Sequence, residues 1–296
     1  MADKKNILVT GSDGQLGNSI RKISIEFEMY NFHFTNKNQL DISKFNLVKR
    51  YIENNNINIL INCAAYTNVA LAENNKDQAD LINNLSVDNL AKICSERNIQ
   101  LIHISTDFVF DGLKNDPYNE KDIPNPINFY GLSKLNGEKN MMSYNLKNSV
   151  IIRTSWLYSE IKDNFVSKIL DKIHHQKSIN VVVNEIGSPT NAEDLAIMIL
   201  SIIIELKNDK TEIFHFSNIG FCSRYDLANE INRIVNGKSS IQPINNLEIE
   251  VRRPKYSVLD CNKIIQKFDL RIKDWKYSLK EHLIYTKKNK LYSYEV

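Results

Sequence analysis

A glycine-rich segment near the N-terminus, residues 8–17 (LVTGSDGQLG), most constrains how this chain can fold. Its glycines, Gly11, Gly14 and Gly17, follow an apolar run at 6–10 and open a segment at 14–28 with apolar residues at helical spacing. A strand, a glycine turn and a helix in this order are typical of a dinucleotide-binding site. The first glycine allows the turn, the second lets a pyrophosphate approach the backbone, and the third allows close helix–sheet packing. The spacing is G-x-x-G-x-x-G rather than the commoner G-x-G-x-x-G, and an ordinary tight turn remains the alternative.

The first half of the chain alternates strand-length apolar runs with helical segments. We expect strands at 6–10, 30–35, 57–63, 100–105 and 149–155, and helices at 14–28, 46–54, 76–97 and 130–144. This order predicts an α/β fold with a Rossmann-type, doubly wound parallel sheet covered by helices on both faces. Strands buried on both faces would explain why their apolar runs are continuous.

The second half is less regular and predicts a smaller, mixed α/β substrate-binding lobe. Helices are expected at 164–174, 192–206, 224–235 and 279–286, and strands at 179–183 and 212–217. We therefore expect a dinucleotide-binding Rossmann domain over residues 1–155 and a mainly substrate-binding lobe over 156–296. Segments near 179–219, including the strands at 181 and 213, are expected to return to the first domain.

Composition excludes several other classes of protein. The 38 basic and 35 acidic residues give a net charge of only +3, with no basic stripe interleaved with aromatics, so we expect no nucleic-acid partner. The longest apolar stretch, near 195–206, is interrupted by Ser201 and Glu205 and is too short to cross a membrane. The four cysteines form no C-x-x-C pair and have no histidine at metal-ligand spacing. We expect no metal site, reduced thiols and, without the apolar core of a signal peptide, a cytoplasmic location.

The end of the second predicted strand bears on which nicotinamide cofactor binds. An acidic residue there would accept from the ribose 2′-hydroxyl and favour NAD. This chain has Thr35, Asn36 and Lys37 instead, and a cation suits a 2′-phosphate. The sequence therefore favours NADPH over NADH, unless Lys37 is simply a solvated loop residue.

A second group of polar residues predicts the chemistry. Thr106 ends the strand that begins near 100, and Tyr130 and Lys134 lie four apart on one face of a predicted helix. Reduction of a ketone needs a hydride on carbon and a proton on oxygen. A tyrosine, whose ordinary pKa is about 10, can donate that proton when a nearby ammonium favours the phenolate. We predict Tyr130, Lys134 and Thr106 as the catalytic residues, with Thr106 orienting the carbonyl and a nicotinamide carrying the hydride.

These motifs together resemble the extended short-chain dehydrogenase/reductase family, and within it the dTDP-4-dehydrorhamnose reductases, nearly end to end. The matching segments are 14–17 (GQLG), 62–67 (NCAAYT), 105–107 (STD), 130–134 (YGLSK), 137–138 (GE), 153–156 (RTSW), 187–190 (GSPT) and 252–254 (RRP). The resemblance implies NAD(P)H-dependent reduction of the C4 ketone of dTDP-4-dehydro-L-rhamnose to dTDP-L-rhamnose, for bacterial cell-surface polysaccharide. It also implies a possible homodimer.

The resemblance assigns roles residue by residue. The proton donor matches Tyr130, and Thr106 and Lys134 complete the triad. Sugar-nucleotide contacts match Thr106, Asp107 and Trp156, although Trp156 taken alone would be a core aromatic. Arg252 and Arg253 either bind the diphosphate or form a solvated basic pair. With the glycine turn, the expected cofactor-contacting set is Gly11, Gly14, Gln15, Leu16, Gly17, Asp41, Ile42, Ala64, Ala65, Tyr66, Tyr130 and Lys134.

Two departures from the family pattern leave the substrate open. Ala70 and Leu71 stand where the family usually has an acid and often a lysine, and Phe108 stands where it mostly has tyrosine. The alternatives are a reductase or epimerase of another NDP-4-keto-6-deoxy sugar, or a non-catalytic nucleotide-binding regulatory subunit. The intact triad argues against the regulatory subunit.

Overall fold

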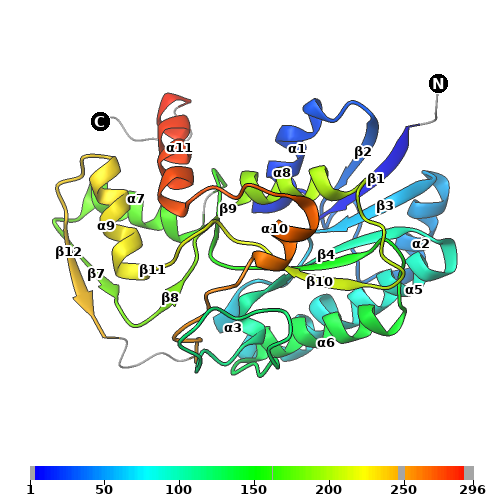
Figure 1. Ribbon diagram of the computed structural model, residues 1–296, viewed down its shortest axis with the longest axis horizontal. Helices are drawn as coiled ribbons and strands as arrows, with labels where there is room; N and C mark the ends of the chain where they lie inside the picture. The colour runs from blue at the N-terminus through cyan, green and yellow to red at the C-terminus, as the bar shows by residue number, and fades with distance from the viewer. Residues whose placement is uncertain (1–3, 162, 246–250, 290–296) are drawn as a thin grey trace.

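A six-stranded parallel sheet forms the centre of the larger lobe. The computed structural model describes residues 4–161, 163–245 and 251–289. The strand order is β10-β5-β4-β3-β1-β2, and each neighbouring pair is parallel (Figure 1). The strands are β1 (Lys5–Thr10), β2 (Tyr30–Thr35), β3 (Ile57–Asn62), β4 (Gln100–Thr106), β5 (Val150–Thr154) and β10 (Glu212–His215). The predicted Rossmann-type α/β fold is confirmed.

Helices cover both faces of this sheet, as the continuous apolar strands predict. On β1, Ile7 and Val9 belong to one core cluster while Leu8, pointing the other way, belongs to a second. Residues of α1 (Gln15–Ile23), α8 (Ala192–Ile202) and α10 (Asn262–Phe268) complete the first cluster. Residues of α2 (Phe45–Asn54), α5 (Ser86–Arg97) and α6 (Phe129–Ser143) complete the second.

The long helix expected at 76–97 is interrupted. It begins as α4 (Lys76–Asp80), passes through a π-helical turn, η2 (Leu81–Leu85), and continues as α5. A further short helix, α3 (Val69–Asn74), precedes it, and the 3₁₀ turns η1 (Ser24–Glu26) and η3 (Asp107–Val109) follow α1 and β4. The π turn lies against α6 and places a buried asparagine, Asn83, between that helix and Tyr66 in the loop after β3.

The smaller lobe is mixed α/β, and its core is a separate hydrophobic cluster. Among the described residues it contains three two-stranded pairs. They are β6 (Leu157–Tyr158) with β9 (Thr190–Asn191), β7 (Ser178–Val182) with β12 (Ser240–Ile244), and β8 (Ile186–Gly187) with β11 (Cys222–Ser223). Of these strands, β7, β8, β9, β11 and β12 are labelled on the left and in the centre of Figure 1. Its helices are α7 (Phe165–His175), α9 (Arg224–Ile234) and α11 (Trp275–Lys288).

The two strands expected to return to the main sheet behave differently. The strand near 213 does so as β10, at the edge beside β5. The prediction for the strand near 181 is wrong, because this strand, β7, pairs with β12 instead. Its burial alternates between exposed and buried, which suits a strand covered on one face only. The division of the chain near residue 155 stays a prediction.

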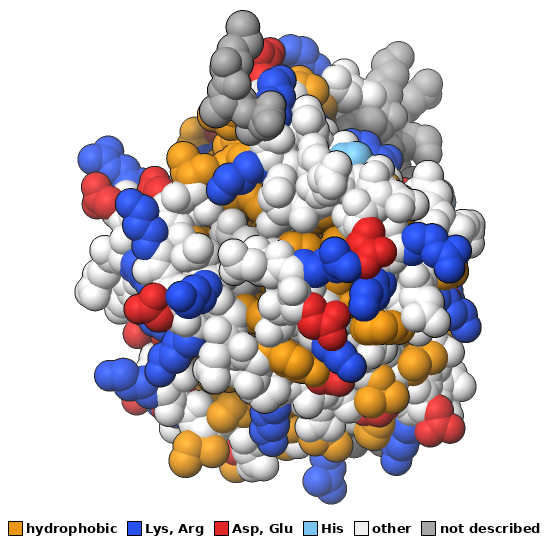
Figure 2. Space-filling model, turned by 90° about the vertical axis from the view of Figure 1, so that its right-hand side faces the viewer, with side chains coloured by type: hydrophobic (Ala, Val, Ile, Leu, Met, Phe, Trp, Pro, Cys, Tyr) orange, Lys and Arg blue, Asp and Glu red, His pale blue; other side chains and the backbone are white. Residues whose placement is uncertain are grey.

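The distribution of charged side chains on the surface, and the length and apolar character of the helices, bear on the classes of protein discussed above. On the face in Figure 2, Lys and Arg side chains are interspersed with Asp and Glu. Within residues 4–161, 163–245 and 251–289, no helix combines the length and apolar character needed to cross a bilayer.

Candidate active site

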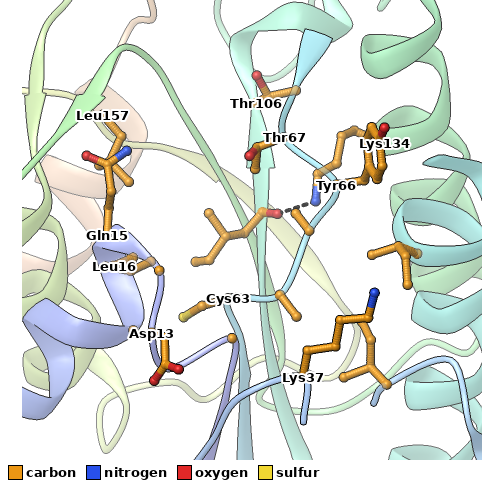
Figure 3. A pocket seen from close by; sticks show the side chains of 18 of the residues that line it. Asp13, Gln15, Leu16, Lys37, Cys63, Tyr66, Thr67, Thr106, Lys134 and Leu157 are labelled. Carbon is orange, nitrogen blue, oxygen red and sulfur yellow. Dashed lines mark hydrogen bonds between the residues drawn. The ribbon is translucent and has the colours of Figure 1, made fainter. Parts of the chain in front are cut away.

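The carboxyl ends of the central strands open into one cavity of about 770 Å³. The predicted catalytic, cofactor-contacting and sugar-contacting residues all line this cavity, whereas Arg252 and Arg253, the candidate diphosphate ligands, do not. The predicted residues that line it are Gly11, Gly14, Gln15, Leu16, Gly17, Asp41, Ile42, Ala64, Ala65, Tyr66, Thr106, Asp107, Tyr130, Lys134 and Trp156. In Figure 3, Asp13 and Lys37 lie toward one end of the view and Thr106 toward the other. The cavity is therefore elongated between the glycine turn and the predicted catalytic residues.

The glycine turn has no room for side chains at two of its three positions. Gly11 has a φ of +65°, and a Cβ atom there would lie 2.7 Å from the backbone nitrogen of Ala64. A Cβ atom at Gly17 would lie 2.5 Å from the carbonyl oxygen of Gly11. Gly14 is the N-cap of α1 and offers no side chain to the first N–H groups of that helix. The helix N-terminus, which carries a partial positive charge, thus borders the cavity and fits a pyrophosphate.

The loop after β2 forms the wall of the cavity that faces the glycine turn. Asn36 and Lys37 line the cavity, and the Asn36 amide donates to Asp13 Oδ2 at 2.7 Å. Asp41 accepts from the backbone N–H and hydroxyl of Ser43, and these bonds lower its pKa although burial acts against them. Lys37 is exposed, so its ammonium is accessible to a phosphate at this end.

At the other end, Thr106 links the strand β4 to the helix that carries Tyr130. The Thr106 hydroxyl donates to Asp107 Oδ1 at 3.0 Å and accepts from the Phe108 N–H at 3.2 Å. Burial raises the pKa of Tyr130 to about 12, despite the Thr106 hydrogen bond, which lowers it. Tyr130 therefore keeps its proton at neutral pH, as a proton donor must.

Lys134 lies beneath Tyr130 and is held by buried partners. Its Nζ donates to the carbonyl oxygen of Ile104 at 2.6 Å, drawn as a dashed line in Figure 3, and lies 3.2 Å from His103 Nε2. Burial lowers the pKa of Lys134 to about 8, against the attraction of Glu138. The lowered Tyr130 pKa that the sequence predicts is not seen in the free protein, because burial is the largest influence on that pKa and raises it.

A line of buried polar groups supports Lys134 from inside the sheet. His103 Nδ1 lies 3.1 Å from Asn62 Nδ2, and Asn62 Oδ1 accepts from the Thr10 hydroxyl at 2.7 Å. Burial, together with the Lys134 charge, lowers the pKa of His103 well below its ordinary value. The imidazole is therefore neutral, so one of its ring nitrogens accepts a hydrogen bond and the other donates one.

A buried ion pair fixes the catalytic helix to the sheet. Arg153 on β5 binds Glu138 on α6 in bidentate fashion, with Nη2–Oε2 at 2.6 Å and Nε–Oε1 at 2.9 Å. Ser105 on β4 donates to the same carboxylate. Three elements that carry site residues are thus joined at one point, and sequence reasoning gave these residues only as part of a resemblance.

Two further residues that position the site were missed. Gly131 lets α6 approach the η3 turn, since a Cβ atom there would lie 2.1 Å from the carbonyl oxygen of Phe108. The Asn83 amide bonds both backbone groups of Tyr66, at 2.8 and 3.0 Å, and donates to the Ser133 hydroxyl at 3.0 Å. The available signal was a glycine inside a helical segment, which usually has a packing reason.

The substrate end of the cavity contains buried polar atoms without partners among the described residues. They are Asp107 Oδ2 and Thr154 Oγ1. Burial raises the pKa of Asp107 to about 6, although hydrogen bonds from Ser257 and Thr106 act against it. Trp156 lines the same end and has a φ of 45°, the left-handed region that bulky residues rarely occupy. Such atoms and such strain are common where a ligand completes the site.

Comparison with known proteins identifies the family. The family model described as the RmlD substrate binding domain matches residues 5–287. The dTDP-4-dehydrorhamnose reductase of Aggregatibacter actinomycetemcomitans is 34% identical over 285 residues, covering 93% of this chain and 97% of the relative. The chain belongs to the dTDP-4-dehydrorhamnose reductase family.

Two other relatives indicate the range of this family. A crystal structure of a dTDP-4-dehydrorhamnose reductase from Bacillus anthracis in complex with NADP has a TM-score of 0.91 and 34% identity, and covers 96% of this chain and 100% of that one. The methionine adenosyltransferase 2 subunit beta of Pongo abelii is 31% identical, covering 88% of this chain and 81% of the relative.

The departures from the family pattern lie outside the cavity-lining residues. Ala70 and Leu71 are exposed on α3, and the neighbouring Glu73 accepts from the Phe129 N–H at 2.6 Å. The Phe108 ring packs edge-on against Tyr130, with centroids 5.9 Å apart. Phe108 therefore acts on the site through the packing of Tyr130.

Two predictions from the sequence remain to be compared with the structure: the roles of Arg252 and Arg253, and the metal site. Arg252 is exposed, whereas Arg253 has a buried Nε without a partner among the described residues. No group of three or more His, Cys, Asp or Glu side chains within those residues is placed to hold a metal ion.

Proposed function

We propose that the protein reduces the C4 ketone of dTDP-4-dehydro-L-rhamnose to give dTDP-L-rhamnose, for bacterial cell-surface polysaccharide. The observation that carries this proposal is the arrangement of one cavity, with Thr106, Tyr130 and Lys134 at one end and the glycine turn at the other. Membership of the reductase family supports the substrate class.

NADPH is the proposed cofactor. The turn at Gly11–Gly17 and the N-terminus of α1 would hold the pyrophosphate, and Lys37 would pair with the 2′-phosphate. The NADP complex of the Bacillus anthracis relative supports this choice. When bound, the nicotinamide supplies the hydride.

The protein's own residues orient the ketone and move the proton. Thr106 would donate to the C4 oxygen and fix the carbonyl beside Tyr130. The Tyr130 hydroxyl, protonated at neutral pH, would give its proton to that oxygen as the alkoxide forms. The Lys134 ammonium would then stabilise the phenolate.

The sugar end is proposed to use Asp107 and Trp156. Asp107 Oδ2 is buried without a partner among the described residues, so a sugar hydroxyl can donate to it. The Trp156 indole lines the cavity and offers an apolar surface to a deoxysugar.

The test is product analysis with purified protein. Incubation with NADPH and dTDP-4-dehydro-L-rhamnose, generated in situ, should yield dTDP-L-rhamnose, identified by NMR, with NADPH preferred to NADH. Turnover of a different 4-keto-6-deoxy sugar nucleotide but not this one would favour the alternative substrate. Cofactor binding without turnover of any keto sugar would favour a regulatory subunit, a role that the Pongo abelii relative's name makes worth testing.

Two further expectations accompany this function. A cytoplasmic location is supported by four free cysteines. A homodimer remains a prediction, checked by light scattering coupled to size-exclusion chromatography.

A further inference from the structure

The backbone of Trp156 adopts a conformation that needs support from its surroundings. Its φ of 45° is strained for a bulky residue, and such strain persists only where neighbouring groups hold it. Its carbonyl oxygen accepts from the Thr190 N–H at 3.2 Å. Besides this backbone hydrogen bond, the indole ring makes close contacts of its own.

The contacts of the ring come from the two-stranded ribbon β8–β11 and from the start of α9. A Cβ atom at Gly187 on β8 would lie 2.5 Å from Cε2 of the indole, so the ring packs directly on this backbone. Cys222 on β11 pairs with Gly187, which brings Arg224, the first residue of α9, to the same place. The Arg224 guanidinium carbon lies 3.5 Å from the centroid of the Trp156 ring.

Arg224 is itself held in place. Its Nε lies 3.6 Å from Glu185 Oε2, its backbone N–H donates to the Glu185 carbonyl oxygen at 3.2 Å, and its guanidinium also lies over the Phe165 ring. The Arg224 side chain is only 13% exposed. A planar guanidinium that is stacked and paired in this way is pre-organised, which a lysine cannot reproduce.

We propose that Arg224 is a positioning residue that clamps the Trp156 indole against Gly187 and thereby forms the wall of the sugar subsite. It acts through Trp156 and sets affinity for the sugar nucleotide, while hydride and proton transfer depend on other residues. This inference rests on the proposed function only for its kinetic consequence; the clamp itself is a property of the free protein.

The experiment combines kinetics with fluorescence of Trp156. The chain has two tryptophans, so a Trp275→Phe background leaves Trp156 as the single reporter. In that background Arg224→Met removes the charge and Arg224→Lys keeps it without the planar stack. Arg233→Met is the matched control, since Arg233 lies on the same helix, is 68% exposed and pairs with Glu230.

We expect the Arg224 variants to change the KM for the sugar nucleotide but not kcat or the KM for NADPH. Both Arg224 variants should raise the KM for the keto sugar nucleotide about tenfold, with kcat and the KM for NADPH within about twofold. The affinity for dTDP alone should not change. Acrylamide should quench Trp156 more strongly and its anisotropy should fall, whereas Arg233→Met should match the background protein.

Three results would overturn the proposal. An equal loss of dTDP affinity would make Arg224 a phosphate ligand instead. Full retention of sugar affinity by Arg224→Lys would show that charge matters and stacking does not. Unchanged quenching and anisotropy would show that no clamp exists. The fluorescence arms need no substrate, so failure of the proposed function would appear separately, as absent turnover in the unmodified protein.

Discussion

Replacing Gly131 by alanine should lower kcat sharply while leaving the glycine turn at the other end of the cavity intact. An added Cβ atom would lie 2.1 Å from the Phe108 carbonyl oxygen, where ordinary contact begins at 3.4 Å, so α6 and the η3 turn must separate by more than about 1 Å. Tyr130 precedes Gly131 on the helix, and Thr106 lies two residues before Phe108. The displacement therefore falls on the pair that positions the ketone, and a misplacement of this size costs about a hundredfold in kcat.

The assay measures kcat with the keto sugar nucleotide and the Kd for NADPH for Gly131→Ala. Leu132→Ala is the control, since Leu132 is the next residue of the same helix and is 40% exposed. Without a clash, alanine would stabilise the helix by up to about 1 kcal/mol. A raised Tm together with a kcat within about threefold of wild type would refute the close-approach reasoning.

Three other changes test neighbouring parts of the site. Because burial lowers the pKa of Lys134 to about 8, the ammonium is lost as pH rises through that value, so kcat should decline above pH 8; a pH profile that is flat there would contradict the role of its charge. His103→Leu removes a buried neighbour of both Lys134 Nζ, at 3.2 Å, and Asn62 Nδ2, at 3.1 Å, so denaturant unfolding should show a loss of about 1–3 kcal/mol in the free energy of unfolding, and an unchanged value would contradict this role. Lys37→Ala should raise the KM for NADPH about tenfold and leave that for NADH unchanged, and equal effects on both would argue against a 2′-phosphate contact.

The sequence predicted those parts of the site that depend on strand ends. Thr106 and the glycine turn follow buried strands, and parallel strands present their carboxyl ends at one edge of the sheet. The sequence also places Tyr130 and Lys134 on one face of a single helix. In the structure these two residues line the same cavity as Thr106 and the glycine turn.

The sequence could not reveal features set by tertiary contacts. Apolar spacing over 76–97 is helical throughout, so it does not record the π turn that directs Asn83 toward Tyr66. Strands of two residues, such as β8 and β11, are too short for a periodicity. The ammonium of Lys134 faces Ile104 and His103 because β4 runs beneath α6, a relation that only the packed structure shows.

The central claim is that Tyr130 gives its proton to the C4 oxygen of a keto sugar nucleotide. The most direct measurement compares NADPH oxidation by wild-type protein and Tyr130→Phe with dTDP-4-dehydro-L-rhamnose, alongside the NADPH Kd of each. We expect rapid turnover in the wild type and a fall of at least about a hundredfold in kcat in the variant, with NADPH affinity little changed. Turnover that survives in Tyr130→Phe would contradict the assignment of the proton donor.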